Sequence, residues 1–344
     1  MNRFITLVAL AILPGPLRAS ELEVVAEFGE RQPIGMAVSA KPNRVFVSFP
    51  HREPFVNALV EIVNGKEVAF PNAAWNAYQP EDWAHHFFNV QDLYADDRHN
   101  LWVLDPHGHP KLVRIDLEKN AVADVYTFDG LPKESALNDM VVDHTHGLAY
   151  LSDPGLAAIV VLDLKTRAHR VVLRNDPATL AEPGFKLRIE DKDVEDANGR
   201  PFVSNVNGIA LTHDDQWFYF RAINQPFLYR IDTRHLADAS LTDKELSAKV
   251  EKVAETGVCH GMVAGHDGKI YLTDSAHKEI RYVSPEGVGE TLVRDERLIW
   301  PDSTGIGSDG YLYLTCSQIN RGAGFNGGKA RYEFPFRAYK VKLP

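Results

Sequence analysis

The sequence predicts an all-β protein folded as a six-bladed β-propeller. One pattern occurs six times in the 344 residues: a polar or small residue, an apolar run, a turn rich in Asp, His, Gly or Asn, and a second run of aromatic and β-branched residues. Each copy has the chemistry of a β-hairpin, and several are followed by a third strand-like run. Because an isolated hairpin cannot bury its apolar face in water, such units are stable when they form a closed ring of blades.

The first 19 residues have the features of an export signal. Arg3 precedes an apolar run at 4–13, Pro14-Gly15-Pro16 interrupts any helix, and Ala19-Ser20 offers small residues for cleavage. The apolar run is about half of the ~20 residues that span a bilayer. We therefore expect cleavage after Ala19, export to the periplasm or the cell exterior, and no membrane insertion of the mature chain, residues 20–344.

The mature chain is expected to form one propeller domain that is closed by its N-terminal strand. The segment LEVVAEF at 22–28 has no hairpin partner of its own. The last strand-like run, FRAYKVKL at 336–343, ends the chain without a following partner. We expect the first segment to complete the sixth blade beside the last, which leaves no open edge at that point of the ring. A two-domain chain and a β-sandwich are the alternative architectures.

Two segments between the repeats depart from the strand pattern. Ser240, with Asp243 three residues later, resembles a capping box and predicts one short helix in an inter-blade loop within 238–252. Residues 174–206 contain Asn198-Gly199, which predicts an extra hairpin.

The six repeats themselves lie at 34–49, 91–105, 138–153, 207–222, 260–274 and 302–316.

Charge and cysteine content narrow the class of partner. The chain has 37 Lys and Arg against 47 Asp and Glu, a formal charge of −10, which makes nucleic acid an unsuitable partner. The two cysteines, Cys259 and Cys316, are expected at the same mouth of adjacent blades. An exported protein can oxidise them, but the sequence leaves open whether they lie close enough for a disulfide.

Alignment of the repeats predicts two rings of side chains around one mouth of the central channel. The start of the first strand and the end of the second lie at the same end of an antiparallel pair. The first ring contains Ile34, Gln91, Asn138, Asn207, His260 and Asp302, and the second contains Asp105, Asp153, Arg221, Asp274 and Cys316. Polar groups that converge on one opening indicate a small-molecule site. Asp and Asn at strand ends also commonly cap turns, which is the plain alternative.

Within these rings, Gln91, Asn138, Asn207, Arg221 and Asp302 are the candidate ligand-binding residues. His260 is the ring member whose ordinary pKa lies near neutrality, so it is the candidate catalytic residue, acting as a proton shuttle. A solvated loop histidine without a functional role is the alternative.

Several segments resemble the yellow / major royal jelly protein family. They include NLWVLDPHGHPKLVRIDL, LNDMVVDHTHGLAYLSDPGLAAIVVLDLKT and IWPDSTGIGSDGYLYLTCSQIN, which occur in the family's order and extend over nearly the whole mature chain. The resemblance implies a secreted six-bladed propeller linked to dopachrome conversion or to the binding of biogenic amines in the channel. The leading hypothesis is therefore an exported propeller that binds a small molecule, or an isomerase or tautomerase acting on an aromatic catechol, indole or amine.

The sequence is more distantly similar to calcium-dependent gluconolactonases. This resemblance implies that Asn138 and Asp139 contact the substrate and that Asn207 binds the metal. Ile34 and His260 stand where that family has acidic ligands, so Asp302 would have to complete a calcium site with Asn207. A metal-dependent lactone hydrolase is thus the alternative function, and a non-enzymatic protein-interaction scaffold is a second alternative.

Overall fold

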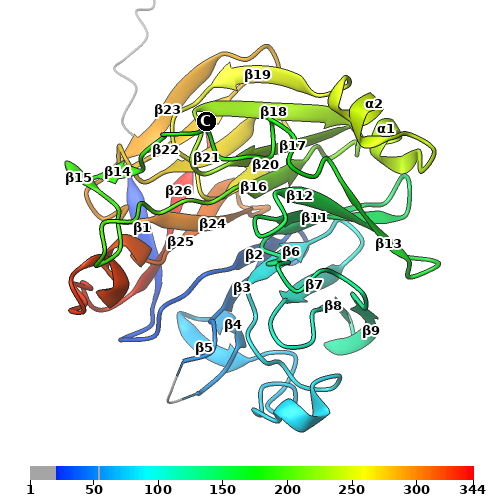
Figure 1. Ribbon diagram of the computed structural model, residues 1–344. Coiled ribbons are helices and arrows are strands. Elements are labelled where there is room, and N and C mark those ends of the chain that lie inside the picture. The colour runs from blue at the N-terminus through cyan, green and yellow to red at the C-terminus, as the bar shows by residue number, and fades with distance from the viewer. Residues whose placement is uncertain (1–20, 53–54) are drawn as a thin grey trace, which may run out of the picture.

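The computed structural model describes residues 21–52 and 55–344 and is a six-bladed propeller (Figure 1). The expected signal peptide, residues 1–19, lies outside the described residues. Within the described part of the chain, no helix has the length and apolarity that a membrane span needs.

Each blade is an antiparallel sheet of four strands, one more than the three expected from the sequence. The additional outermost strands, such as Lys66–Ala69, are largely exposed and lack the apolar run that identifies the inner ones. Listed from the channel outward, the blades are: β2 (Met36–Ser39), β3 (Arg44–Ser48), β4 (Leu59–Val63), β5 (Lys66–Ala69); β6 (Asp92–Ala95), β7 (Asn100–Asp105), β8 (Lys111–Asp116), β9 (Ala121–Thr127); β10 (Met140–Asp143), β11 (Leu148–Asp153), β12 (Ala158–Asp163), β13 (His169–Val172); β16 (Val206–Leu211), β17 (Trp217–Ala222), β18 (Phe227–Asp232), β19 (Glu251–Glu255); β20 (Met262–Ala264), β21 (Ile270–Asp274), β22 (Glu279–Val283), β23 (Gly289–Arg294); and β24 (Pro301–Ile306), β25 (Tyr311–Cys316), β26 (Arg337–Lys342), β1 (Leu22–Glu27).

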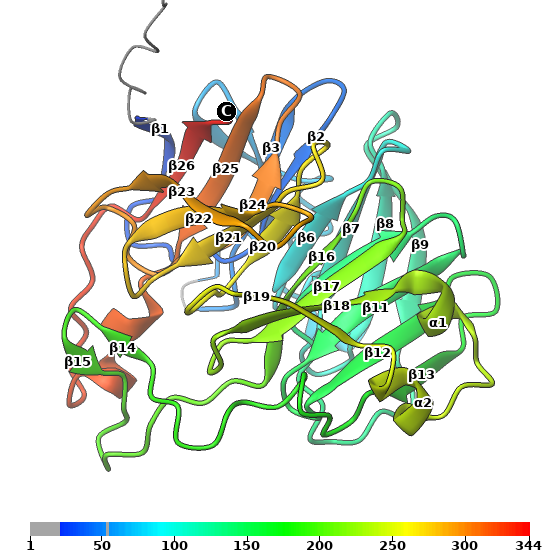
Figure 2. The ribbon, with the colours of Figure 1, turned by 90° about the horizontal axis from the view of Figure 1, so that it is seen from above.

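The N-terminal strand closes the ring, as predicted. β1 pairs antiparallel with β26, from Leu22 opposite Val341 to Glu27 opposite Arg337, and the two strands lie side by side in Figure 2. Leu22 and Ala26 are buried, whereas Val24 between them is 48% exposed. Residues two apart share a face of a regular strand, and the pairing register shifts between Val24 and Ala26, so an irregularity interrupts the alternation of β1 at this point.

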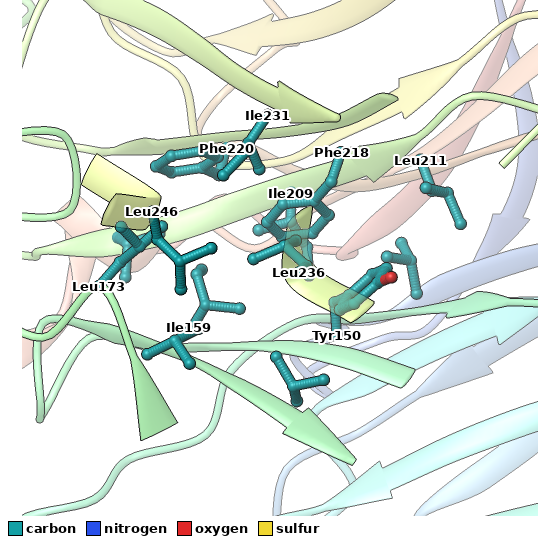
Figure 3. Close-up of a cluster of buried hydrophobic side chains, with 14 of the residues drawn as sticks. Tyr150, Ile159, Leu173, Ile209, Leu211, Phe218, Phe220, Ile231, Leu236 and Leu246 are labelled. Carbon is teal, nitrogen blue, oxygen red and sulfur yellow. The ribbon is translucent and has the colours of Figure 1, made fainter. Parts of the chain in front are cut away.

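The hydrophobic core lies between neighbouring blades. Figure 3 shows the cluster between the third and fourth blades, where Tyr150 and Ile159 face Phe218 and Phe220. Burial of each such side chain stabilises the fold by roughly 1.5–3 kcal/mol before entropy losses. The same face-to-face packing holds each blade in position around the channel.

The structure has two short α-helices in place of the one expected from the sequence, α1 (Thr233–Ala237) and α2 (Asp243–Ser247). Asp232 caps α1, and Thr242 forms a capping box with Glu245 at the start of α2. The predicted cap, Ser240, instead donates a hydrogen bond from its hydroxyl to Asp238, 2.6 Å away. Thr242 forms the box because the Glu three residues later is long enough to reach back to the backbone N–H of the cap.

The predicted extra hairpin is present, as β14 (Arg188–Ile189) and β15 (Lys192–Asp193). Its turn is Glu190-Asp191, both with positive φ, while Asn198-Gly199 forms a separate tight turn. An ion pair of 2.9 Å between Glu190 and Arg321 ties the hairpin to the loop that contains the 3₁₀ turns Ile319–Arg321 and Ala323–Phe325 (Figure 2). A third 3₁₀ turn is Pro80–Asp82.

The two cysteines are free thiols in the structure. Cys259 and Cys316 are both buried and unbridged. The thiol of Cys259 donates to the carbonyl oxygen of Gly261 at 3.1 Å, and burial raises its pKa to about 11.

Candidate functional site in the central channel

The innermost strands of the six blades surround a central cavity of about 100 Å³. We call the end at which these strands begin the first mouth, and the opposite end the second mouth. The middle of the cavity is apolar and is lined by Met36, Leu93, Met140 and Met262 among others. Glycines permit the close approach of the strands: a Cβ on Gly261 would lie 2.2 Å from the carbonyl oxygen of Asp302. The channel is therefore narrow, with polar groups at its two ends.

Three carboxyl groups, Asp92, Asp139 and Asp302, lie at the first mouth and line the cavity. We call them the acidic trio. Asp92 begins β6, Asp139 immediately precedes β10, and Asp302 is the second residue of β24. Asp92 accepts a hydrogen bond of 2.9 Å from the Met140 backbone N–H, and Asp302 accepts one of 2.7 Å from the Ser317 hydroxyl. The third blade thus holds Asp92 of the second blade in place, whereas Asp302 is held within its own blade.

The electrostatics of the acidic trio favour its protonated forms or a bound cation. Burial raises the pKa of Asp92 to about 7, and the charge of Asp302 adds to the shift. Burial also raises the pKa of Asp302 to about 6, and burial together with Asp92 and Asp302 raises that of Asp139. Among the described residues, no Lys or Arg lines this cavity. Carboxyl groups are costly to bury as anions without a partner, so the mouth attracts positive charge.

Two of the amide residues predicted for the first ring, Gln91 and Asn138, form hydrogen bonds beside the acidic trio. Gln91 lines the cavity and donates to the Asn138 side-chain oxygen at 3.3 Å, while Asn138 donates to Asp139 at 2.7 Å. Asn207 is half-buried in β16, where the pairing register shifts between Val206 and Ile209. Asn138 and Asn207 are not among the residues that line the cavity, so their predicted ligand contacts need a ligand that extends beyond it.

His260 lies beside this mouth in an environment that differs from the predicted one. It is 1% exposed, its Nε2 is 2.6 Å from the Ser275 hydroxyl, and its ring stacks on Trp300 at 4.0 Å. Burial, with a smaller effect from the positive charge of Arg221, lowers the pKa of His260 to about 3. The imidazole is therefore neutral at physiological pH, which removes the reason for expecting a proton shuttle here.

Arg221 and the second ring are structural. The guanidinium of Arg221 is fully buried and donates to the Thr256 hydroxyl and to the carbonyl oxygens of Gln225 and Gly257, so it is unavailable to a channel ligand. The three aspartates of that ring each accept hydrogen bonds from backbone N–H groups: Asp105 from Phe88 and Asn89, Asp153 from Ala136 and Leu156, and Asp274 from Ala276 and His277. Asp153 and Asp274 thus cap the turns that follow them, which is the alternative given for this ring, whereas Asp105 holds the loop segment at 88–89.

Comparison with known proteins places the chain in a family. Residues 88–342 match the family model of the major royal jelly protein. The chain belongs to the major royal jelly protein family. The match begins three residues before Gln91, so it includes the whole acidic trio. No curated protein matches the chain.

Solved structures share the propeller at low sequence identity. A gluconolactonase from Xanthomonas campestris has a TM-score of 0.56 and 12% identity, covering 94% of this chain and 90% of that one. The calcium-binding protein regucalcin from Agrobacterium tumefaciens has a TM-score of 0.54 and 13% identity, with coverage of 94% and 96%. Virginiamycin B lyase from Staphylococcus aureus has a TM-score of 0.51 and 14% identity, with coverage of 94% and 100%. These likenesses show the shared fold.

The carboxyl groups at the first mouth do not form the compact acidic set that is typical of a calcium site. Calcium takes six to eight oxygen ligands at about 2.3–2.6 Å, so its ligands lie within about 5 Å of one another. Among the described residues, the one group of three acidic, His or Cys side chains whose ligand atoms all lie within 4.8 Å is Asp274, His277 and Glu279. The carboxyl groups around Asp302 are more widely spaced, so Asn207 and Asp302 lack the compact acidic set that a calcium site needs.

Asp92 is the site residue that the sequence analysis missed. It occupies the same place in the repeat QDLYADD as Asp139 does in NDMVVDH, directly after a ring amide. The repeat alignment predicts channel residues at the first position of each repeat, whereas Asp139, at the second position, is predicted only from the gluconolactonase resemblance. Comparison of both positions would have identified Asp92.

Proposed function

We propose that this protein binds a small, positively charged organic molecule, a protonated amine, in its central channel. The observation that supports the proposal most directly is the acidic trio, whose carboxyl groups line a cavity without Lys or Arg among its described residues. An ammonium group would supply the missing counter-charge for Asp92, Asp139 and Asp302 and would keep them ionised.

The apolar part of the channel suits the body of such a ligand. Met36, Met140 and Met262 line the cavity, and their flexible thioethers make favourable contacts with aromatic rings. A cavity of about 100 Å³ is smaller than most ligand pockets, so we expect a compact ligand or an outward shift of these side chains. The link between the yellow / major royal jelly family and biogenic amines involves the same ligand chemistry.

Proton transfer on the bound compound is a second candidate function, and one observation favours it. Asp92 and Asp302 have raised pKa values of about 7 and about 6, so near neutral pH one carboxyl group holds a proton while the other is ionised. In a tautomerase the carboxylate removes a proton from one atom of the substrate and the carboxylic acid delivers a proton to another. The predicted isomerase chemistry would then reside in the acidic trio.

We also propose that the chain is exported, on the evidence of residues 1–19. The small-molecule ligand would then be met in the periplasm or outside the cell. The formal charge of −10 gives no support for a nucleic-acid partner.

Calorimetric titration of the mature protein tests the amine proposal. Tryptamine carries a positive charge at pH 7.5 and indole-3-acetate a negative one on the same ring system. We expect tryptamine to bind and indole-3-acetate not to bind. Asp302→Asn should weaken tryptamine binding about tenfold, in line with the loss of a charge-assisted contact. Asp129→Asn, a change of the same kind at an exposed loop position, is the control and should leave affinity unchanged.

The pH dependence provides a second criterion. As pH falls from 7.5 to 5, the acidic trio gains protons and loses negative charge, so amine affinity should fall. Equal affinity for the amine and the acid would overturn the proposal. So would wild-type tryptamine binding by both Asp302→Asn and Asp139→Asn, or stoichiometric calcium binding that Asp302→Asn abolishes.

A further inference from the structure

The backbone at the start of the sixth blade has a rare conformation beside Asp302. Trp300, two residues before Asp302, has a φ of 50°, in the left-handed region that bulky residues rarely adopt. Such strain persists only where the surrounding structure enforces it, and it is typical of functional sites. Ser317 lies opposite, directly after β25. We call Trp300, Asp302 and Ser317 the Trp300 corner.

Asp302 itself lies in a β-bulge. Where β24 advances by three residues, from Pro301 to Thr304, its partner β25 advances by two. Bulges commonly redirect a side chain next to a functional site. The first blade fixes this bulge, because the Met36 backbone N–H donates to the Ser303 hydroxyl at 2.9 Å. The direction of the Asp302 side chain is therefore set by an irregular backbone and not by the alternation of a regular strand.

Contacts from separate segments hold Trp300 in its strained conformation. The side chain is 2% exposed, and its ring stacks on His260, which precedes the fifth blade, at 4.0 Å. Phe202, in the connection between the third and fourth blades, meets the ring edge-on at 5.4 Å. The loss of one of these contacts leaves the other in place, so Trp300 does not depend on His260 alone.

Ser317 joins Trp300 to Asp302. Its backbone N–H donates to the Trp300 carbonyl oxygen at 3.1 Å, and its hydroxyl donates to Asp302 Oδ2 at 2.7 Å. Ser317 is fully buried, and the side-chain amide of Gln32 donates to its carbonyl oxygen. Among the described residues, the Ser317 hydroxyl is the one hydrogen-bond donor to this carboxyl group. Such a donor stabilises the ionised form of a carboxyl group.

We propose that Trp300 and Ser317 are positioning residues of the channel site, which together hold the Asp302 carboxylate at the first mouth as the principal contact of the ligand's ammonium group. The inference rests on the proposed function for the identity of that group. The left-handed backbone at Trp300 sets the place of Ser317, and the Ser317 hydroxyl then fixes the carboxylate that the bulge directs into the cavity.

The titratable neighbours of Asp302 agree with this role. Burial raises the pKa of Asp302 to about 6 and that of Asp92 to about 7, so Asp302 loses its proton first as pH rises. Burial, with the charges of Asp92 and Asp302, also raises the pKa of Asp139. His260 is neutral near pH 7, and burial raises the pKa of the Cys316 thiol. Asp302 is therefore the carboxylate that is available first to a cation.

Carbon-13 NMR of the aspartate carboxyl groups in the ligand-free mature protein tests the role of Ser317. The Asp302 signal is assigned by its loss in Asp302→Asn. Ser317→Ala should raise the pKa of Asp302 from about 6 by about one pH unit, because the ionised form loses its donor. Tryptamine affinity should then fall about threefold at pH 6.5, in proportion to the ionised fraction of Asp302, and should change less at pH 8.5.

Ser39→Ala is the matched control. Ser39 is also a buried serine at a strand end, but its hydroxyl donates to the Pro42 carbonyl oxygen at 2.6 Å, near the second mouth. The variant loses a hydrogen bond of the same kind and should keep the wild-type pKa of Asp302 and the wild-type tryptamine affinity.

Trp300→Ala and Trp300→Gly test the left-handed backbone. Both remove the same ring contacts, but glycine adopts a positive φ without strain. The glycine variant should keep the wild-type pKa of Asp302 and should melt at the higher temperature of the two. The alanine variant should show the rise expected for Ser317→Ala. If neither variant can be purified, the Ser317 measurement decides.

The proposal is overturned if Ser317→Ala leaves the pKa of Asp302 unchanged, or if Ser39→Ala shifts it equally. An unchanged pKa in both Trp300 variants would overturn the role of Trp300. The NMR titration uses no ligand, so absence of tryptamine binding by the wild type would contradict the amine proposal and leave the positioning of Asp302 measurable. Tryptamine binding with the same affinity and pH profile in Ser317→Ala would contradict the positioning role alone.

Discussion

Asp92 and His260 are both buried near the first mouth, and burial shifts the pKa of each toward its neutral form. For Asp92 the pKa rises to about 7, and for His260 it falls to about 3. Consequently, the groups that titrate near neutral pH at this mouth are carboxyl groups, with Asp302 at about 6 as the second one. The carboxyl groups of the acidic trio, and not His260, would therefore carry out acid–base chemistry at this mouth.

The variant His260→Ala tests this assignment. It should lower the free energy of unfolding by about 2–3 kcal/mol, because it removes the stack on Trp300 and leaves the Ser275 hydroxyl without its partner. The pH profile of tryptamine binding between about pH 5.5 and 7.5 should keep its wild-type shape. Urea unfolding and calorimetry measure the two effects. A flattened profile in this variant would instead show that His260 contributes to the pH dependence of binding.

The candidate site was partly predictable at the residue scale. The repeat alignment placed Gln91 and Asp302 at the cavity because strand starts around a ring meet at one mouth. The same rule assigned Arg221 and Asp274 to the mouth, where the structure has them bonded to backbone groups. Sequence position fixes the strand end on which a side chain lies, whereas its direction depends on which partners are within reach.

At the scale of elements, strands with an apolar run were predictable and the outermost strands were not. β7 is buried at every residue, while β5 alternates between exposed and half-buried. An outer strand has one neighbour and one solvent face, so its sequence carries little hydrophobic periodicity. β1 is the exception: it could be predicted because the first strand-like segment and the last one each lacked a partner, so pairing them completes the sixth blade.

Deletion of residues 21–28 tests the closure. The change removes the buried Leu22, Ala26 and Phe28 and exposes the edge of β26, so we expect a melting temperature lower by more than about 10 °C or aggregation on heating. Val24→Thr, at a 48% exposed position of the same strand, is the control and should change the melting temperature little. Phe28→Ala provides a milder test if the deletion variant cannot be purified. An unchanged melting temperature in the deletion variant would contradict the closing role of β1.

At the scale of the whole molecule, the acidic trio lowers the stability of the ring that holds it. The folded pKa of Asp92, about 7, lies above the ~3.9 of an unfolded chain, so between these values the folded state binds more protons. Its contribution to stability is present at low pH and is lost as pH rises through about 4–7. A group retained at such a cost is typical of a functional site.

Asp92→Asn tests this trade-off, since it keeps the shape and removes the charge. We expect the free energy of unfolding to increase by about 1–3 kcal/mol at pH 8 and to change little at pH 4.5. Tryptamine affinity at pH 7.5 should fall in the same variant. Denaturant unfolding at the two pH values gives the comparison. An equal effect at both would show that packing, and not charge, dominates at Asp92.

The pairing of β1 with β26 sets the order in which the molecule can be completed. The ribosome makes Leu22 long before its partner Val341, so the sixth blade cannot form until β26 has been made. Until then β1 has no partner and the ring stays open, which exposes strand edges that other chains could pair with. Contacts so distant in sequence also make assembly slow. Passage of an unfolded chain across a membrane before closure would be compatible with this order, because the propeller can only be completed once the C-terminal strand has arrived.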